Sequence, residues 1–347
     1  MVEIVLQNIQ KNFGDFIAVK NSNLKVKTGE FFVMLGPSGC GKTTTLRMIA
    51  GLEIPTSGNI MLDNNNVTSL RASQRDIAFV FQLFALYPHL NVEKNISFPL
   101  RMQKMKSSEI KERVREVSQL LRIEHLLKSK VSTLAGGDRR RVALGREIVR
   151  RPAAFLMDEP LGTLDTEFRE KMCLELRKLH NRIQATTVYV THDQIEALTF
   201  ADQVVVMHEG QIVQTGTPVE LFEKPKHTFV GHFIGSPGMN ILPCEIKNGQ
   251  INFEGKILPS NTSIKKTNFS KTQVGIRPEF INFSNDGIKV KIKRVSDTGR
   301  HKVIDTECNS GRIKILANAS AEIPSENTHI TFDQKYTYVY GDDWIIE

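Results

Sequence analysis

Residues 36–44 read Gly-Pro-Ser-Gly-Cys-Gly-Lys-Thr-Thr, an uninterrupted phosphate-binding loop of the pattern G-x-x-x-x-G-K-T. Glycines at these places let the backbone turn tightly and point successive N–H groups at phosphate oxygens. The apolar run 31–35 before the loop predicts a buried strand, and 43–50 after it predicts a helix. This order of strand, loop and helix restricts the chain to an α/β fold in which the start of the helix faces an anion.

Each part of the loop has its own chemical role. The backbone cradles phosphates, Lys42 supplies a point charge to the β- and γ-phosphates, and the Thr43 hydroxyl is a ligand for Mg²⁺. We therefore expect ATP and Mg²⁺ as cofactors. The nucleotide-binding residues predicted from the loop are Gly36, Pro37, Ser38, Gly39, Cys40, Gly41, Lys42, Thr43 and Thr44.

Strand-like and helix-like segments alternate through the first 235 residues, which favours a largely parallel α/β core. Helical periodicity at 107–128 and a second helix at 138–151 predict a helical insertion, a subdomain of about residues 84–151. Beyond residue 235 short strand-like pieces recur with turn signals. We expect an ATPase domain at 1–235 and a small all-β, OB-like domain at 236–347.

The charge and composition of the chain limit the kinds of partner that it can bind. The 347 residues carry a formal net charge of +8, which suits a nucleotide, a nucleic acid or an anionic membrane surface. We do not expect nucleic acid, because the arginine run 139–141 has no interleaved aromatic residues. The sequence has no run of 18 apolar residues and no signal-like start, so any association with a membrane is expected to be peripheral.

A pair of acids supplies the second half of the chemistry. Asp158 and Glu159 directly follow the apolar run 153–157, at the predicted carboxyl end of a strand. In nucleotide hydrolases this position holds an aspartate that binds Mg²⁺ and an acid that orients the attacking water. The sequence therefore predicts Asp158 as a metal ligand and Glu159 as the general base or water-orienting acid.

With these motifs the chain resembles the ATP-binding subunit of ABC transporters over essentially its whole length. Val80-Phe81-Gln82 is similar to the family's Q-loop, Leu134-Ala-Gly-Gly-Asp138 to its signature, and Thr191-His192-Asp193 to its switch-histidine segment. Leu161-Gly-Thr-Leu-Asp165 is similar to its D-loop, and Phe13 falls where the family has an aromatic residue against adenine.

The resemblance implies further roles. Gln82 would join Thr43 and Asp158 on Mg²⁺ and sense the membrane partner, and His192 would contact the γ-phosphate, so the catalytic residues are Glu159, His192 and Gln82. Two ATPase domains would close head to tail, as a homodimer or with a different subunit. Each nucleotide would then be completed by the opposing subunit's signature residues Ala135, Gly136, Gly137 and Asp138, and Asp165 of the D-loop is a further nucleotide-binding residue.

Segments 84–89, 231–240 and 275–279 are similar to the ATPases of maltose-type sugar importers. That branch handles oligosaccharides, polyols and glycerol-3-phosphate, and its relatives import polyamines, iron or molybdate. The resemblance implies two membrane-spanning permease subunits, a solute-binding protein and a place at the cytoplasmic face of the inner membrane. It also implies a regulatory or dimerising role for the C-terminal domain.

The signature departs from the family's usual Leu-Ser-Gly-Gly-Gln at two positions, Ala135 and Asp138. The missing serine hydroxyl would bond the γ-phosphate across the dimer, an interaction of about 1.5–3 kcal/mol. Reduced or asymmetric hydrolysis is one consequence, and a hydrolysis-impaired regulatory subunit is an alternative. A soluble ABC ATPase of DNA repair or translation is a third class, but the sequence lacks the second ATPase unit or long coiled coil common there.

Overall fold

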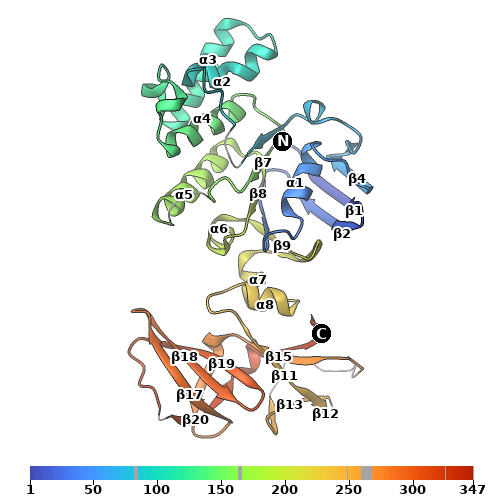
Figure 1. Cartoon of the computed structure of the whole chain (residues 1–347), viewed down its shortest axis with the longest axis vertical. Coiled ribbons are helices and arrows are strands. Elements are labelled where there is room, and N and C mark those ends of the chain that lie inside the picture. Colours follow the sequence, from blue (N-terminus) through green and yellow to red (C-terminus); the bar gives the residue numbers. More distant parts are fainter. Residues whose placement is uncertain (82–84, 163–165, 248, 259–267, 325, 347) are drawn as a thin grey trace. The chain divides into compact units, whose positions relative to one another are not determined.

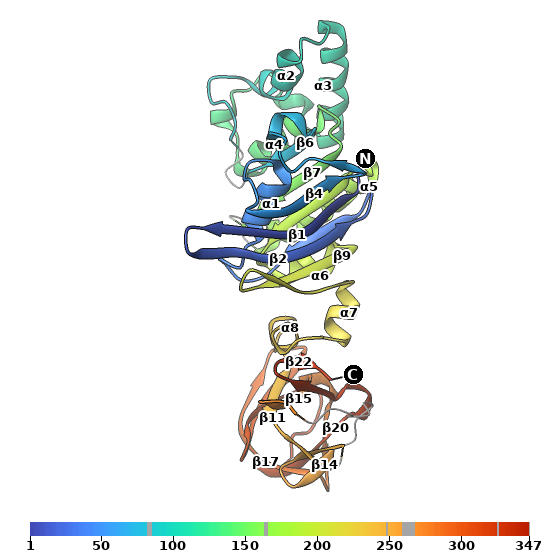
Figure 2. The ribbon, with the colours of Figure 1, turned by 90° about the vertical axis from the view of Figure 1, so that its right-hand side faces the viewer.

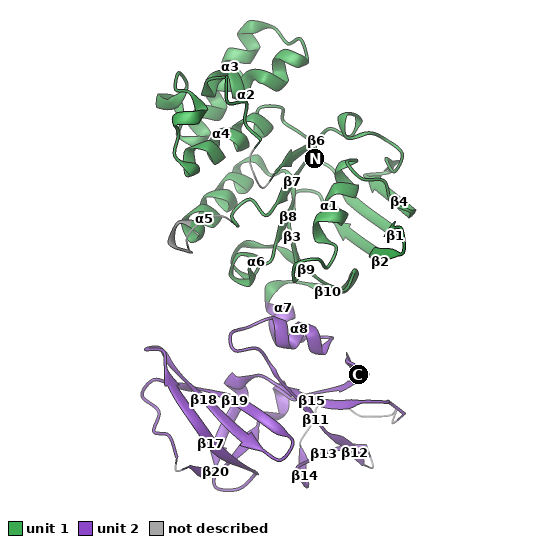
Figure 3. Ribbon diagram, in the orientation of Figure 1, with its two compact units in different colours: residues 1–218 green, residues 219–347 purple. Residues whose placement is uncertain are grey.

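The computed structural model describes residues 1–81, 85–162, 166–247, 249–258, 268–324 and 326–346. Two compact units divide the chain at residues 218 and 219 (Figure 3). The short helices α7 (Pro218–Glu223) and α8 (Thr228–Phe233) therefore fall at the start of the second unit. The functional boundary that the sequence predicts at residue 235 stays a prediction.

The first unit is built on a six-stranded sheet of order β10-β9-β3-β8-β7-β6. Its strands are β3 (Phe31–Leu35), β6 (Ile77–Val80), β7 (Ala154–Asp158), β8 (Thr186–Thr191), β9 (Gln203–His208) and β10 (Gln211–Gly216). Every neighbouring pair is parallel except β9 and β10. β3, β7 and β8 are buried along their whole length, as parallel strands covered on both faces must be. The parallel α/β core predicted from the sequence is confirmed.

A second, antiparallel sheet covers one side of this core (Figures 1 and 2). Its order is β2-β1-β4-β5, formed by β1 (Ile4–Phe13), β2 (Phe16–Val26), β4 (Ser57–Leu62) and β5 (Asn65–Asn66). Helix α1 (Lys42–Ala50) contributes Leu46, Met48 and Ile49 to one apolar cluster with residues from both sheets. The helix that follows the phosphate-binding loop is thereby fixed on two sides.

The helical subdomain contains α2 (Val92–Met102), α3 (Ser107–Leu121) and α4 (Gly136–Ile148), which lie together in Figure 1. Helix α3 ends earlier than the sequence predicts, because Arg122 adopts a left-handed backbone with φ 58°. Sequence analysis missed α2, which contains Pro99, a residue that usually ends a helix. The Asn91 side chain stabilises the start of α2 as its N-cap, because its Oδ1 accepts a hydrogen bond from Lys94 N. The core helices α5 (Thr166–Ile183) and α6 (Gln194–Phe200) complete the first unit.

The second unit is all-β after its two short helices, as predicted. Its strands form three antiparallel sheets: β11-β15-β21-β22, β12-β13-β14 and β16-β20-β17-β18-β19. In chain order these strands are β11 (Asn240–Pro243), β12 (Glu245–Lys247), β13 (Gln250–Phe253), β14 (Lys256–Leu258), β15 (Thr272–Ile276), β16 (Ile281–Ser284), β17 (Ile288–Asp297), β18 (His301–Cys308), β19 (Gly311–Asn318), β20 (Asn327–Phe332), β21 (Tyr338–Gly341) and β22 (Trp344–Ile345). Residues from all three sheets share one apolar core.

Arg277 ties the short helices to this β unit. The side chain is 2% exposed, and it donates to the carbonyl oxygens of Phe222 and Ile234, both at 2.6 Å. These carbonyls lie at the carboxyl ends of α7 and α8, where a cation is favourable. Burial lowers the pKa of Arg277 to about 10, which still leaves it charged at neutral pH. Arg277 is therefore a structural residue of the second unit.

Candidate nucleotide site

The phosphate-binding loop joins β3 to α1 at the carboxyl edge of the parallel sheet. At two positions the surroundings require glycine. A Cβ on Gly36 would lie 2.3 Å from the Met207 carbonyl oxygen. Gly41 has φ 102°, and a Cβ there would lie 2.6 Å from the Ala18 carbonyl oxygen. The loop pattern read from the sequence thus has a steric reason at both ends of the loop.

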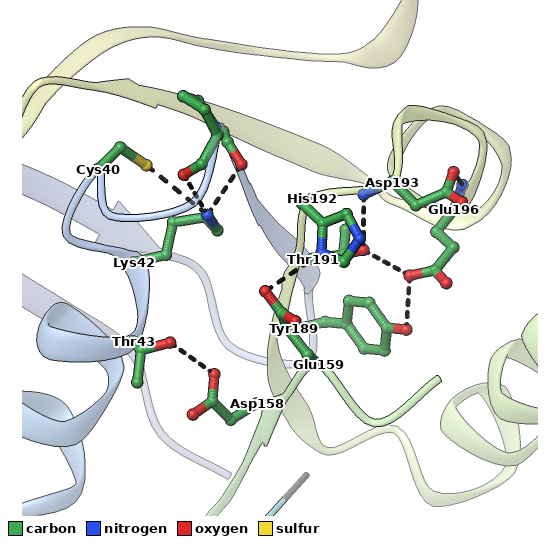
Figure 4. A network of polar contacts seen from close by, with 12 residues as sticks. Cys40, Lys42, Thr43, Asp158, Glu159, Tyr189, Thr191, His192, Asp193 and Glu196 are labelled. Carbon is green, nitrogen blue, oxygen red and sulfur yellow. Dashed lines mark hydrogen bonds and ion pairs between the residues drawn. The ribbon is translucent and has the colours of Figure 1, made fainter. Parts of the chain in front are cut away.

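Lys42 turns inward over this loop. It is 4% exposed, and its Nζ donates to the carbonyl oxygens of Gly36 and Pro37 at 2.8 Å each, with Cys40 Sγ at 3.7 Å (Figure 4). The first turn of α1 contains Lys42 and three threonines but no acid, so the start of the helix favours an anion. A buried ammonium and a helix N-terminus together give the loop strong positive potential.

Asp158 comes from the end of β7 and faces α1. Its Oδ1 accepts a hydrogen bond of 2.9 Å from Thr43 Oγ1. Burial raises the pKa of Asp158, and the Thr43 hydrogen bond opposes this rise. The structure thus brings together two of the three side chains that the sequence predicts as metal ligands, and their oxygen donors suit a hard divalent cation.

Glu159 and His192 meet across the ends of β7 and β8. Glu159 has φ 43°, a left-handed backbone that is uncommon for residues other than glycine. Its N–H donates to Val190 O at 3.0 Å, and its Oε1 lies 3.3 Å from Nδ1 of His192. The His192 side chain is 51% exposed. Figure 4 shows Lys42, Thr43, Asp158, Glu159 and His192 around one region where β3, β7 and β8 end, the usual ligand edge of a parallel sheet.

Other predicted site residues lie elsewhere. Gln82 and Asp165 fall outside the described residues. Phe13 ends β1 at the hairpin with β2 and is 49% exposed, with Lys11 Nζ 4.8 Å from its ring centre. The structure thus leaves the Phe13 ring accessible.

The altered signature begins helix α4. Ala135 is its N-cap residue and offers no side-chain hydrogen bond to the helix start. Ala135 and Gly136 are exposed, and Asp138 Oδ1 lies 3.5 Å from Nη1 of Arg141. The signature residues therefore occupy a separate element from the loop, and the partial neutralisation of Asp138 by Arg141 moderates its negative charge.

Sequence analysis missed one member of the site's surroundings. Glu196 on α6 is 4% exposed and bonds two hydroxyl groups of β8. A signal was present, since Asp193 and Glu196 have the spacing of a helix N-cap and its third residue. That pattern predicts the start of a helix and says nothing about contacts with β8.

Comparison with known proteins places this geometry in a family. The family model described as "ABC transporter" matches residues 19–162, which include the loop, the signature, Asp158 and Glu159. The sn-glycerol-3-phosphate import ATP-binding protein UgpC of Escherichia coli O1:K1 is 48% identical over 289 residues, covering 82% of this chain and 81% of that relative. The chain belongs to the ABC transporter ATP-binding proteins.

Further ABC relatives extend the match along the chain. UgpC of Bordetella avium is 43% identical and covers 94% of this chain and 91% of the relative. The uncharacterized ABC transporter ATP-binding protein YurJ of Bacillus subtilis is 41% identical and covers 93% of each. The match of nearly full length includes the second unit, so the family resemblance inferred from the sequence is confirmed.

Solved structures agree with the ABC fold. CbiO1 of Clostridium perfringens, part of the cbiONQ transporter complex, has a TM-score of 0.60 and 29% identity, covering 64% of this chain and 90% of that chain. The dimeric bacterial ABC cassette MJ0796 has a TM-score of 0.55 and 34% identity, covering 62% of this chain and 98% of that chain. Another structure of MJ0796 is a dimer in a post-hydrolysis state with ADP and phosphate bound. ATP is thus the nucleotide of this family's site, and this chain is an ATPase.

Proposed function

We propose that this chain is the ATP-hydrolysing subunit of an importer for sn-glycerol-3-phosphate or a similar small sugar-like solute. The observation that carries the proposal is the loop of an ABC ATPase with Thr43 and Asp158 bonded at 2.9 Å, in a chain up to 48% identical to ATPases named for that import. The polyamine, iron and molybdate alternatives have no support among the relatives described above.

The loop residues and Lys42 bind the phosphates of ATP. Lys42 Nζ already lies among the loop carbonyl oxygens, so a bound phosphate competes with Gly36 O and Pro37 O for its donors. The Phe13 ring, at the end of β1, stacks on the adenine. These contacts orient the γ-phosphate toward the ends of β7 and β8.

Hydrolysis then needs a positioned water. Glu159 holds the water by accepting a hydrogen bond, and His192 donates to a γ-phosphate oxygen. The water oxygen bonds to the γ-phosphorus, the bond to the β–γ bridging oxygen breaks, and the water proton passes by way of Glu159 to the released phosphate, which leaves ADP and inorganic phosphate as the products. Glu159 Oε1 and His192 Nδ1 are 3.3 Å apart, so one small movement of these two side chains can bring both to the γ-phosphate.

The residues present fit Mg²⁺. Thr43 Oγ1 and Asp158 Oδ1 are hard ligands only 2.9 Å apart, and Gln82 is the third proposed ligand. The described residues contain no group of three His, Cys, Asp or Glu side chains that would hold a metal alone, which is consistent with a cation that shares its coordination with phosphate. Thr43, Asp158 and Gln82 would hold Mg²⁺, which would supply positive charge against the phosphates of ATP.

A second ATPase subunit completes the proposed site. Its Ala135, Gly136, Gly137 and Asp138, at the exposed start of α4, would face the γ-phosphate, together with Asp165 of the D-loop. Among the described residues, no helix is long and apolar enough to span a membrane. Because the UgpC relatives are named for import, we propose that two permease subunits and a solute-binding protein provide the solute path, with this chain at the cytoplasmic face of the membrane.

Uptake in cells tests the proposal. The chain is expressed in Escherichia coli from which UgpC has been deleted, and uptake of radiolabelled sn-glycerol-3-phosphate is measured beside the Lys42→Ala variant. We expect uptake with the natural chain and none with the variant. Purified chain that hydrolyses ATP but never restores uptake of this solute would contradict the solute assignment, whereas absence of ATP hydrolysis would contradict the ATPase role itself.

A further inference from the structure

A buried carboxylate lies behind the loop that carries His192. Glu196 is 4% exposed, and its Oε2 accepts hydrogen bonds from Tyr189 Oη at 2.8 Å and from Thr191 Oγ1 at 2.6 Å (Figure 4). Both donors come from β8 and are themselves buried. Two hydroxyl donors on one oxygen form a strong local network, because the surroundings are shielded from water.

The same network fixes the backbone on both sides of His192. Thr191 Oγ1 also accepts from the N–H of Asp193 at 3.0 Å. Asp193 in turn caps α6, with Oδ1 accepting from Ile195 N at 2.8 Å and Glu196 N at 3.3 Å. Residues 191 and 193 are therefore both held, and the half-exposed His192 side chain is presented from a fixed loop.

Arg169 joins this loop to α5. Its Nη1 lies 2.7 Å from Asp193 Oδ2 and its Nε lies 3.7 Å from Glu196 Oε1. Helix α5 begins at Thr166, directly after the D-loop segment 161–165. The ion pairs of Arg169 thus connect the His192 loop to helix α5, which directly follows the D-loop segment in the sequence.

Arg140, on the signature helix α4, is 1% exposed. Burial lowers the pKa of Arg140, and the negative charge of Glu196 opposes this change. The negative charge of Glu196 therefore offsets part of the cost of burying the Arg140 guanidinium.

Resting on the proposed function of the site, we propose that Glu196 is a positioning residue for ATP hydrolysis. Its carboxylate holds the loop of His192 in place and, through Arg169, links that loop to helix α5. Glu196 is buried and bonds Thr191, which in turn accepts from Asp193 N, so it acts through the backbone on either side of His192. Loss of its charge lets the loop shift, and a misplacement of about 1 Å at a reacting group can slow a reaction on the order of 100-fold.

Glu196→Gln tests this role, since it keeps the size and one acceptor oxygen but removes the charge. We expect kcat for ATP hydrolysis to fall about 10-fold to 100-fold while KM for ATP changes less than about threefold. The control is Glu170→Gln, an exposed glutamate on α5, which should leave both constants unchanged. A Glu196→Gln enzyme with normal kcat, or with a raised KM alone, overturns the proposal.

A double-mutant cycle shows whether Glu196 acts through His192. If it does, His192→Ala with Glu196→Gln is no slower than His192→Ala alone. Losses that multiply overturn the proposal. If Glu196→Gln does not fold, Tyr189→Phe and Thr191→Val each remove one donor to the carboxylate and carry the same cycle. An inactive natural chain contradicts the proposed function instead, so the two failures are distinguishable.

Discussion

At the scale of the residue, two neighbouring carboxylates at the end of β7 have different surroundings. Asp158 is 9% exposed and bonds the Thr43 hydroxyl. Glu159 turns through a left-handed backbone toward His192, with a side chain 21% exposed. These two consecutive residues therefore suit different partners: Asp158 suits a cation, and Glu159 suits a water molecule.

Glu159→Gln is the most direct residue-scale prediction. It keeps a hydrogen-bond acceptor near the water but removes the negative charge, so ATP hydrolysis should fall about 100-fold or more. ATP binding should persist, because Lys42 and the loop amides are unchanged. Steady-state phosphate release and binding of a fluorescent ATP analogue measure the two properties. With Glu112→Gln, an exposed change on α3, as the control, equal losses in both variants would contradict the role of Glu159.

The sequence predicted most of this site because its residues belong to short contiguous motifs. The loop residues could be assigned because the loop directly follows one recognisable apolar strand. Asp158 and Glu159 could be assigned because they lie at the carboxyl end of another. Glu196, Tyr189 and Arg169 could not, because their contacts arise only when α5 and α6 pack against β8. Lys42 was predicted as a phosphate ligand, but its bonds to Gly36 O and Pro37 O depend on loop geometry.

At the scale of the element, the altered signature changes how helix α4 starts. The N-cap position prefers Ser, Thr, Asn or Asp, whose side chains accept a hydrogen bond from the helix, and Ala135 cannot do so. Ala135→Ser should therefore stabilise the protein by about 1 kcal/mol and raise the melting temperature of the ATPase unit by about 2–4 °C. Differential scanning calorimetry checks this, and Ala135→Val, which caps no better than alanine, is the matched control.

The same variant reports on the interface. If the serine hydroxyl also reaches the nucleotide of a second subunit, ATPase activity should rise about tenfold to a hundredfold, more so with Asp138→Gln added. A higher melting temperature with an unchanged rate would mean that Ala135 limits only the helix, and the account of a weakened site would be wrong.

Asp202 joins strand β3 to helix α5, and its ionisation makes the stability of the fold depend on pH. Its carboxylate accepts from Phe31 N at 2.8 Å, at the start of β3, and from Arg177 Nη2 at 2.6 Å, on α5. Burial alone would raise the pKa of Asp202, but these two bonds outweigh it and hold the pKa below its usual value. The stabilisation is therefore complete above the unfolded pKa of about 3.9 and is lost as pH falls through the folded value.

Asp202→Asn should lower the free energy of unfolding by about 1 kcal/mol at neutral pH, a modest value because the carboxylate is partly exposed. The difference from the natural chain should shrink as pH falls below about 4. Urea unfolding followed by circular dichroism across this range measures it, with exposed Asp15→Asn as the control. A difference that stays constant with pH would contradict the assigned role of the charge.

At the scale of the whole molecule, one chain carries one phosphate-binding loop and one signature, on separate elements of its first unit. The α/β core, the helical insertion and the all-β second unit could be predicted from periodicity and motif order. Helix α2 could not, because Pro99 hides its pattern, and the end of α3 depends on the left-handed backbone of Arg122. The central claim is that the loop is half of a site that a second subunit completes.

Complementation between two defective chains tests that claim most directly. Lys42→Ala disables the loop, and Gly136→Asp adds an acid to the signature, where a Cβ meets no described atom of its own chain within 4 Å. Co-expressed with different affinity tags and purified as a mixed dimer, the two variants share one intact site. We predict that each variant alone is inactive and that the mixed dimer regains up to about half of the natural ATPase rate. A mixed dimer as inactive as its parents would contradict the account.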